Sequence, residues 1–554
     1  MSSAFDLSDR FVDEFCELVP TVATQLGVAG RHDSWGDVFG LEGIEELHNL
    51  RQSYRPKFEE QRSDPDRRQA LAAEVFLAAA AEQDEAFQSG DHFLSVRHMA
   101  SPFHQILSTF EVMLTETTDD WENITRRLET IARPLNDYKA LLAVGISKGL
   151  VNSRRQSESL ASQAEAASED SSHFHNIETA ADEKGHMSSR LRAALEHARA
   201  EMGEFADFLR QVYAPAARER DASGPEEYVR AADRLVGLRV DPEAAYEWGW
   251  DEFGRLLGEM ARVGERILPG AEFGEVKELL ETDPEGLADS TDELVRFVEE
   301  VLGQAVDDLA GTHFDVPDVI RPLTVQVAPR GTPLGVYYRG PSEDFSRPGG
   351  VWYSIGDQTR FPLYQHRSTA YHEGFPGHHL QIATARYHRE SLSRFQRLLT
   401  WYPGYGEGWG MYAEVLMGEL GYLDDPRSYF GMLAKQMYRA ARVVVDIGLH
   451  LGRPIPAHSP LEPGENWDFE TAVEFMRVYG FRTPAQAEAE VLRYLGWPGQ
   501  AIAYKLGERE ILAIREESKH RLRDDFDLSR FHAVVLESGA MRLDMLRDVV
   551  RDRL

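Results

Sequence analysis

Apolar residues in the first 310 positions recur at steps of three and four, which is the spacing of one face of an α-helix. Ile124, Leu128 and Ile131 follow this pattern, and the stretch Pro242–Ile267 repeats it with several aromatic residues. The pattern therefore predicts long helices throughout an N-terminal region that covers residues 1–310.

The pattern changes after Asp315, where short β-type runs replace the helical spacing. We expect three strands of one small sheet over Leu323–Val327, Gly335–Tyr338 and Val351–Ile355. A strand can receive an extended peptide backbone by strand addition, which makes the last run and its Tyr353 candidates for substrate binding. A sheet that only covers the core is the alternative. Residues 311–554 form a second region, and the two regions are expected to make one continuous unit around a cleft.

The composition is that of a globular protein with an acidic surface. Of 554 residues, 42% are hydrophobic, so the chain can bury a large core. The formal net charge of −33 argues against nucleic-acid and anionic-membrane partners, which require basic patches. No apolar run reaches the roughly 18 residues of a membrane span, and the start lacks the features of a signal peptide, so we expect a cytoplasmic location. Cys16 is the single cysteine, which leaves His, Asp and Glu as candidate metal ligands.

The segment 371–381 carries the opening of a zinc-hydrolase helix, but it is two residues longer than expected. His372 offers a neutral imidazole that can hold zinc, and Glu373 offers an adjacent carboxylate that can deprotonate a water molecule. The usual second histidine would stand at position 376, which is proline. The second ligand must therefore come from farther along the chain.

A regular helix through this segment cannot bring two histidines to one metal ion. Six residues separate His372 from His378, so their side chains would point to roughly opposite sides of a helix. His379 returns to the face of His372 but lies two turns away, roughly 10 Å along the axis. Pro376 removes a helical hydrogen bond and Gly377 permits unusual backbone angles, so this pair can break the helix. We therefore expect a break that places His378 beside His372.

A third ligand is expected from the glycine-rich segment 401–414 that follows. Catalytic zinc sites use three protein ligands and leave one position open, and a carboxylate from a later helix is the usual third ligand in the glutamate-type enzymes. Glu407 and Glu414 share a helical face two turns apart, so one can bind the metal while the other supports it. Glu407 is preferred because its flanking glycines allow its backbone to approach the site, and Glu414 is the alternative. His379 is expected to pack against or line the site instead of binding the metal.

Residues 493–505 gather hydrogen-bond donors around a turn between two helical pieces. These donors are Arg493, Tyr494, Gln500, Tyr504 and Lys505. The tetrahedral intermediate of amide hydrolysis needs a donor opposite the metal, which Tyr504 or Tyr494 can supply. Arg493 or Lys505 can hold a substrate carboxylate. The alternative is a set of core tyrosines with satisfied hydroxyls and an arginine on the surface.

These motifs carry a resemblance to a known family. They are His372-Glu373, Pro376-Gly377-His378, Glu407-Gly408-Trp409, Arg493-Tyr494 and Pro498-Gly499-Gln500. Together they look like the DUF885 family of bacterial proteins over nearly the whole chain, and that family is similar to the gluzincin zinc metallopeptidases. The resemblance implies a mainly α, metallopeptidase-like fold of the oligopeptidase type, with a small sheet beside the active-site helix. It also implies a hydrolase and does not specify the substrate.

The leading hypothesis is a zinc hydrolase that cleaves short peptides. One zinc ion is bound by His372, His378 and Glu407, and Glu373 is the general base on a metal-activated water. The long helical first half would restrict access, which favours a small peptide or amide substrate over a folded protein. Two alternatives remain open: a zinc-dependent hydrolase of non-peptide amides or esters, and a binding protein whose site is a relic.

Overall fold

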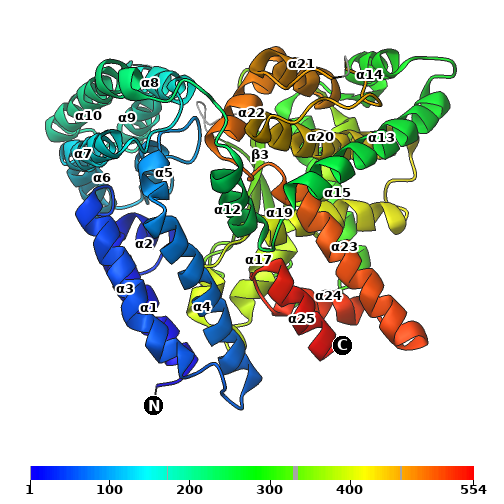
Figure 1. The fold of residues 1–554 in the computed structure, drawn as a ribbon, viewed down its shortest axis with the longest axis horizontal. Coiled ribbons are helices and arrows are strands. Elements are labelled where there is room, and N and C mark those ends of the chain that lie inside the picture. The colour runs from blue at the N-terminus through cyan, green and yellow to red at the C-terminus, as the bar shows by residue number, and fades with distance from the viewer. Residues whose placement is uncertain (1, 171, 329–334, 462–463) are drawn as a thin grey trace. The chain divides into compact units, whose positions relative to one another are not determined.

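The computed structural model describes residues 2–170, 172–328, 335–461 and 464–554, and the chain is mainly helical (Figure 1). It divides into two compact units. The first unit comprises residues 1–221, 393–399 and 495–497. The second unit comprises residues 222–392, 400–494 and 498–554. After residue 221 the chain therefore returns to the first unit twice, each time for a short segment.

The first unit is built from helices with clear start and stop signals. Its helical elements are α1 Ala4–Leu18, α2 Pro20–Leu26, α3 Leu41–Glu59, α4 Arg67–Gln88, η1 Asp91–Leu94, α5 Pro102–Glu111, α6 Thr118–Glu129, α7 Ala132–Lys148, α8 Arg154–Ser168, α9 His173–Glu183, α10 Ser189–Phe208, η2 Leu209–Tyr213, α11 Ala214–Ala216 and α18 Arg394–Leu398. Thr117 begins α6 by accepting a hydrogen bond from the backbone N–H of Asp120. Gly149, whose φ is 69°, ends α7 in the left-handed conformation that favours glycine.

The core of the first unit is apolar and aromatic. Ile124, Leu128 and Ile131, which the spacing assigned to one helical face, all lie in this core. Phe103 stacks on Phe205 with 5.7 Å between the ring centroids. The hydrophobic spacing therefore identified the buried faces correctly in this part of the chain.

The second unit holds the remaining helices. They are α12 Pro225–Val236, α13 Pro242–Ile267, α14 Phe273–Thr282, η3 Pro284–Gly286, α15 Thr291–Leu309, η4 Leu363–Gln365, α16 His366–Glu373, α17 His378–Tyr387, α19 Pro403–Glu419, α20 Pro426–Leu451, α21 Phe469–Tyr479, α22 Pro484–Gly496, α23 Ala503–Leu522, η5 Arg523–Asp525, α24 Leu528–Glu537 and α25 Leu543–Arg553. Only the end of α22, from Leu495, is counted with the first unit. Helix α13 packs against α20, and α19 packs against α23. The second pair approaches closely because Gly404 and Gly408 of α19 face Gly507 of α23.

The three expected strands form one sheet in the second unit. They are β2 Leu323–Val327, β3 Gly335–Arg339 and β4 Gly349–Ser354, in the order β2-β4-β3. Strand β4 is central and pairs in parallel with β2 and antiparallel with β3. A separate antiparallel pair, β1 Leu287–Ala288 with β5 Phe361–Pro362, was not predicted because two-residue strands leave no sequence pattern.

Strand addition at β4 is excluded because both of its edges are already paired. Residues 349–353 pair with β2, and residues 350–354 pair with β3. A substrate backbone can add only to a strand with a free row of backbone groups. The prediction that the run Val351–Ile355 receives a substrate by strand addition is therefore wrong.

The observed units differ from the predicted regions 1–310 and 311–554. The first unit ends at residue 221, and α12 to α15 belong to the second unit. The change of hydrophobic pattern near residue 310 marks the end of α15 at Leu309. Strands follow this helix within the same unit. Hydrophobic spacing locates helices but does not show which core each helix joins.

Candidate metal centre

The helix that carries His372 is interrupted at the predicted place. Helix α16 ends at Glu373 and α17 begins at His378, so residues 374–377 separate two helices. A side-chain carbon at Gly377 would lie 1.9 Å from the backbone oxygen of His372, so only glycine fits this approach. The indole N–H of Trp409 donates a 2.9 Å hydrogen bond to the carbonyl of Pro376 and fixes the break from α19. The predicted break of the helix at Pro376-Gly377 is confirmed.

The break brings His378 beside His372, and Glu407 of α19 faces both. The two imidazole centroids lie 4.9 Å apart. Oε2 of Glu407 lies 3.4 Å from Nε2 of His372 and 3.5 Å from Nε2 of His378. A tetrahedral site with zinc–ligand bonds near 2.0–2.1 Å separates its ligand atoms by about 3.4 Å. The three side chains are thus a group whose candidate ligand atoms all lie within 4.8 Å of one another.

A second layer of hydrogen bonds orients both rings. Nδ1 of His372 lies 2.8 Å from Oε1 of Glu414, and the hydroxyl of Ser368 donates to the same carboxylate. Nδ1 of His378 lies 3.3 Å from Oε1 of Gln381. Because an acceptor faces Nδ1 of each ring, that nitrogen carries a proton, and Nε2, which faces Glu407, is the atom that would bind a metal ion. These residues fit a zinc ion, with Glu407 as a ligand and Glu414 as the support of His372.

The charges of the centre are coupled. Burial alone would lower the pKa of His372, but the carboxylates of Glu407 and Glu414 raise it to about 10. Burial would raise the pKa of Glu407, but hydrogen bonds from the two histidines hold it well below its usual range. Burial raises the pKa of Glu373, which Glu407 increases further and the two histidines oppose. A carboxyl with a raised pKa beside a metal-ligand cluster is typical of a general base.

The glycines around Glu407 act differently from the sequence-based interpretation. Gly406 lies against the ring of Trp401 and Gly408 lies against Gly507, so neither lets the backbone approach the metal ligands. Gly410 is the glycine that matters for the centre, because a side-chain carbon there would lie 2.6–2.8 Å from three ring atoms of His372. Gly410 shares the helical face of Glu407, one turn along α19.

Lys505 is not available to hold a substrate carboxylate. Its ammonium is buried and lies 2.9 Å from Glu252 and 2.6 Å from Glu508. It also donates a 2.6 Å hydrogen bond to Gln436. Burial opposes the charge of Lys505, but the two glutamates outweigh it and raise its pKa. The substrate role predicted for Lys505 is therefore wrong, since its three donors already have partners.

Arg493, Tyr494, Gln500 and Tyr504 form a network with one another and with α20. Arg493 donates to the side-chain oxygen of Gln500 at 2.7 Å and to the hydroxyl of Tyr504 at 3.3 Å. The fully buried hydroxyl of Tyr494 accepts from Nε of Arg442 at 3.3 Å. Tyr494 therefore takes the core position that was the alternative to an oxyanion role, whereas Tyr504 stays 8% exposed.

His379 and Tyr353 are both buried near the centre. The Nε2–H of His379 donates to the carbonyl of Ile320 at 2.7 Å, and its Nδ1 accepts from the hydroxyl of Tyr338 at 3.0 Å. Both ring nitrogens are thus occupied, which agrees with a packing role for His379. Burial raises the pKa of Tyr353, and the carboxylate of Glu373 raises it further.

Sequence reasoning missed two neighbours of the centre. Ser368 holds Glu414, and it stands four residues before His372, on the same helical face. Gly410 makes room for the His372 ring. The helical offset could have indicated Ser368, whereas the contact of Gly410 depends on the packing of separate segments. Trp401 also borders the centre, because it is 46% exposed and its ring centroid lies 6.1 Å from that of His378.

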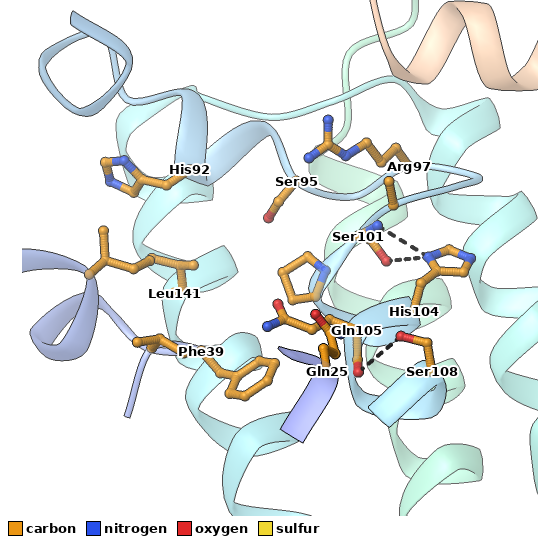
Figure 2. Close-up of a pocket in the computed structure, with 14 residues that line it drawn as sticks. Gln25, Phe39, His92, Ser95, Arg97, Ser101, His104, Gln105, Ser108 and Leu141 are labelled. Atoms are coloured by element: carbon orange, nitrogen blue, oxygen red, sulfur yellow. Dashed lines mark hydrogen bonds between the residues drawn. The ribbon is translucent and has the colours of Figure 1, made fainter. Parts of the chain in front are cut away.

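A separate pocket of about 460 Å³ lies in the first unit, between α5 and neighbouring segments (Figure 2). His104 contributes to its lining, and Nδ1 of this ring accepts from the backbone N–H of Ser101 at 3.2 Å and lies 2.7 Å from the Ser101 hydroxyl. Nε2 of His104 is 2.8 Å from Oε1 of Gln163. Both ring nitrogens are therefore engaged, and His104 completes the capping box that Ser101 begins at the start of α5.

The fold and the centre define a mainly helical protein with a largely buried site of two histidines and one glutamate. The model of a family described as "Bacterial protein of unknown function (DUF885)" matches residues 20–550. The chain belongs to the DUF885 family. This match confirms the family predicted from the motifs.

Two solved structures share the fold over the whole chain. One is "the putative lipoprotein from Colwellia psychrerythraea", with a TM-score of 0.84, 22% identity, and coverage of 100% of this chain and 99% of that chain. The other is "a putative lipoprotein of unknown function from Shewanella oneidensis", with a TM-score of 0.74, 18% identity, and coverage of 100% of both chains. Identities this low carry the fold alone. No curated protein matches the chain.

Within the described residues, no helix combines the length and the apolar character that crossing a membrane requires. The cytoplasmic location stays a prediction, as does the absence of nucleic-acid and membrane partners. The name lipoprotein belongs to the two structural neighbours.

Proposed function

We propose that the protein is a zinc-dependent hydrolase that cleaves amide bonds in short peptides. The observation that carries the proposal is the convergence of His372, His378 and Glu407 at tetrahedral spacing, with Glu373 directly next to the first ligand. Glu414 and Gln381 orient the two imidazoles for a cation. A zinc ion held there would polarise the scissile carbonyl and lower the pKa of a water molecule.

Glu373 is the proposed general base. Its burial raises its pKa toward the working pH, where a carboxylate accepts a proton more readily than at its usual pKa. The proton taken from water by Glu373 then passes to the leaving amine. Because the two steps use the same carboxyl, Glu373 needs to stay close to the metal ligands throughout, and the end of α16 holds it there.

Tyr504 is the proposed hydrogen-bond donor to the oxyanion. Arg493 donates to the Tyr504 oxygen, which leaves the phenolic proton free for substrate. Arg439 neighbours both groups, since its guanidinium lies 5.7 Å from the Tyr504 ring centroid and its charge lowers the pKa of Glu373. Hydroxyl donors of this kind stabilise the negative charge that develops in amide hydrolysis.

The test is Glu373→Gln, compared with the wild type and with Glu488→Gln, which changes an exposed glutamate of α22. Cleavage of a mixed library of short peptides is followed by mass spectrometry, and zinc content is measured on the same samples. We expect Glu373→Gln to keep zinc and to lose at least roughly 100-fold in turnover, the lower range for a general base. Glu488→Gln should behave like the wild type. Wild-type activity that survives in Glu373→Gln would reject the mechanism.

A further inference from the structure

Three arginines of the second unit act on Glu490, and a fourth, Arg439, shares the ring of Tyr438 with two of them. Arg439 and Arg442 come from α20, Arg482 precedes α22, and Arg493 belongs to α22. Glu490 lies 3.0 Å from Arg442 and 3.7 Å from Arg493. Burial opposes ionisation of Glu490, but the arginines hold its pKa below the usual range, so it carries one negative charge. Arg442, Arg482 and Arg493 therefore place three positive charges around one negative charge, whereas the charge of Arg439 acts on Glu373 and Glu414.

Two of the arginines, Arg439 and Arg482, influence nearby carboxylates without forming an ion pair in the described part of the chain. Among the residues that the structure describes, Arg439 and Arg482 make no ion pair, although Arg482 lies 3.8 Å from the centroid of the Tyr438 ring. Arg439 makes one weak hydrogen bond, at 3.5 Å, to the carbonyl of Lys435. Both side chains are half-buried, so they keep contact with solvent. Their charges are available to an anion.

The buried arginine of the group has an unused donor. Arg442 is only 3% exposed, and its Nη2 donates to Glu490 at 3.0 Å and to the hydroxyl of Tyr438. Its Nε donates to Tyr494 at 3.3 Å. Its Nη1 is buried and has no hydrogen-bond partner. A buried charged donor without a partner costs free energy, so binding of an acceptor at this nitrogen would be favourable.

The arginine group adjoins the candidate metal centre. Helix α20, which carries two of the arginines, packs against α16 and α19, which carry the centre. The guanidinium of Arg442 lies 4.7 Å from the centroid of the Tyr504 ring. The charge of Arg439 also acts on the carboxylates of Glu373 and Glu414. A substrate that reaches Glu373 therefore comes within the field of these arginines.

We propose that Arg439, Arg442 and Arg482 bind a carboxylate of the substrate, so that the hydrolase acts near the free carboxyl terminus of short peptides. The guanidinium fork matches the planar carboxylate and holds it more specifically than an ammonium would. Cleavage close to this terminus follows because the carboxylate site adjoins the catalytic glutamate. This inference rests on the proposed hydrolase function and deepens it.

The first measurement compares trialanine with trialanine amide, which differ only in the terminal charge. Binding to the zinc-loaded Glu373→Gln protein is measured by calorimetry, because this variant should bind a peptide without cleaving it. We expect the acid to bind roughly 10-fold or more tightly than the amide, which is the scale of a charge-assisted hydrogen bond. Equal binding of the two peptides, or no binding of either, would overturn the carboxylate site.

Arginine variants locate the site. Arg439→Gln and Arg482→Gln remove charges that support no ion pair, so the fold should tolerate them. Each substitution is expected to weaken the binding of trialanine by about 10-fold and to leave the binding of trialanine amide unchanged. Arg427→Gln is the matched control. Arg427 lies on α20, as Arg439 does, but it forms an ion pair with Asp283. A loss that is equal for acid and amide, or equal in the Arg427→Gln control, would contradict the assignment.

Two further outcomes separate the inference from the function on which it rests. If inorganic phosphate binds more tightly than trialanine and displaces it, the carboxylate assignment is wrong, even though the arginines bind an anion. If the wild type lacks zinc or cleaves nothing in the mixed peptide library, the proposed hydrolase function fails. If the wild type cleaves both peptides at equal rates, the hydrolase stands and the carboxylate site falls.

Discussion

The two units of the molecule bury different kinds of side chain. Among the Asp, Glu, Lys, Arg and His residues in the described part of the first unit, only Arg127 is buried. It donates to the hydroxyl of Thr24 at 2.9 Å and to the carbonyl of Ser34 at 3.0 Å. The second unit buries His372, His378, His379, Glu414, Arg442, Asp446, His450, Lys505, Glu508 and His532.

This difference separates a scaffold from a candidate site of chemistry. Removing an ionisable group from water costs free energy that hydrogen bonds and ion pairs only partly offset. In the first unit charges stay near the surface, as where Arg190 meets Glu122 and Glu129 with all three side chains more than a third exposed. The second unit places some of its buried ionisable groups in the candidate metal centre, such as His372 and His378, and others in networks such as that of Arg442. Such clusters of perturbed groups are typical of functional sites.

The largest effect is expected from Gly377→Ala in the second unit. The added carbon would meet the backbone oxygens of His372 at 1.9 Å and Tyr371 at 2.4 Å. Backbone oxygens cannot rotate away, so we expect a loss of roughly 5 kcal/mol and of zinc binding, which is at the exceptional end for one substitution. The measurement is zinc content together with hydrogen exchange of peptides from each unit.

Gly254→Ala is the control for that change. Gly254 lies in α13 with open space where a side-chain carbon would be added. Alanine favours a helix over glycine by about 1 kcal/mol, so this variant should be slightly stabilised and should keep zinc. If Gly377→Ala behaved in the same way, the close approach at the helix break would not define the site.

The next effect is a pH dependence at Asp446, which is buried in the second unit. Burial raises its pKa from 3.8 to about 7, although hydrogen bonds from Tyr228 and Gly499 oppose the rise. The contribution of a group with a raised pKa is full below pH 3.8 and is lost as the pH rises through about 7. Asp446→Asn should therefore gain about 4 kcal/mol relative to the wild type between pH 4 and 7. Hydrogen exchange of peptides from the second unit measures this difference.

A variant of the first unit sharpens the contrast with Asp446. Phe205→Ala empties part of the apolar core, where Phe205 stacks on Phe103. The expected cost is about 3–5 kcal/mol at every pH, because no ionisable group changes its surroundings. A flat difference for Asp446→Asn, or a sloping one for Phe205→Ala, would undo the distinction between the two units.

The smallest effect is expected for Glu414→Gln, which alters the support of a ligand instead of the ligand. Glu414 accepts from Nδ1 of His372 and from Ser368, and a neutral amide makes the ring a weaker ligand. Zinc affinity should fall by roughly 10- to 100-fold, as measured with a competing chelator. The control is Glu419→Gln. Glu419 lies on α19, as Glu414 does, but it pairs with Arg515 at the surface, so its substitution should leave the zinc affinity unchanged. A Glu414→Gln protein with wild-type affinity would remove Glu414 from the site.

The sequence predicted the centre where local geometry decided it. Pro376 and Gly377 cannot continue a helix beside His372, so a break was the only way to join His378 to the same ion. The three strands of the sheet were predicted for the same reason, because their alternation is local. The helical offset of seven residues between Glu407 and Glu414 likewise indicated one ligand and one support.

Other features depend on contacts between distant segments and could not be predicted. The residues around Lys505 in the sequence do not indicate that it pairs with Glu252. This ion pair engages the ammonium, so that it is not available to a substrate. The place of β4 in the middle of its sheet depends on pairing with two other strands. Position 410 requires a glycine because the ring of His372 packs against it, and His372 stands 38 positions earlier in the chain.

Zinc stoichiometry tests the central claim most directly. Wild type, His372→Ala, His378→Ala and Glu407→Ala are saturated with zinc and desalted, and metal per chain is measured by mass spectrometry. His379→Gln is the control, because both nitrogens of His379 already have hydrogen-bond partners. The account predicts about one zinc per chain in the wild type and the control, and almost none in the three ligand variants. A metal-free wild type, or ligand variants that hold zinc as the control does, would contradict it.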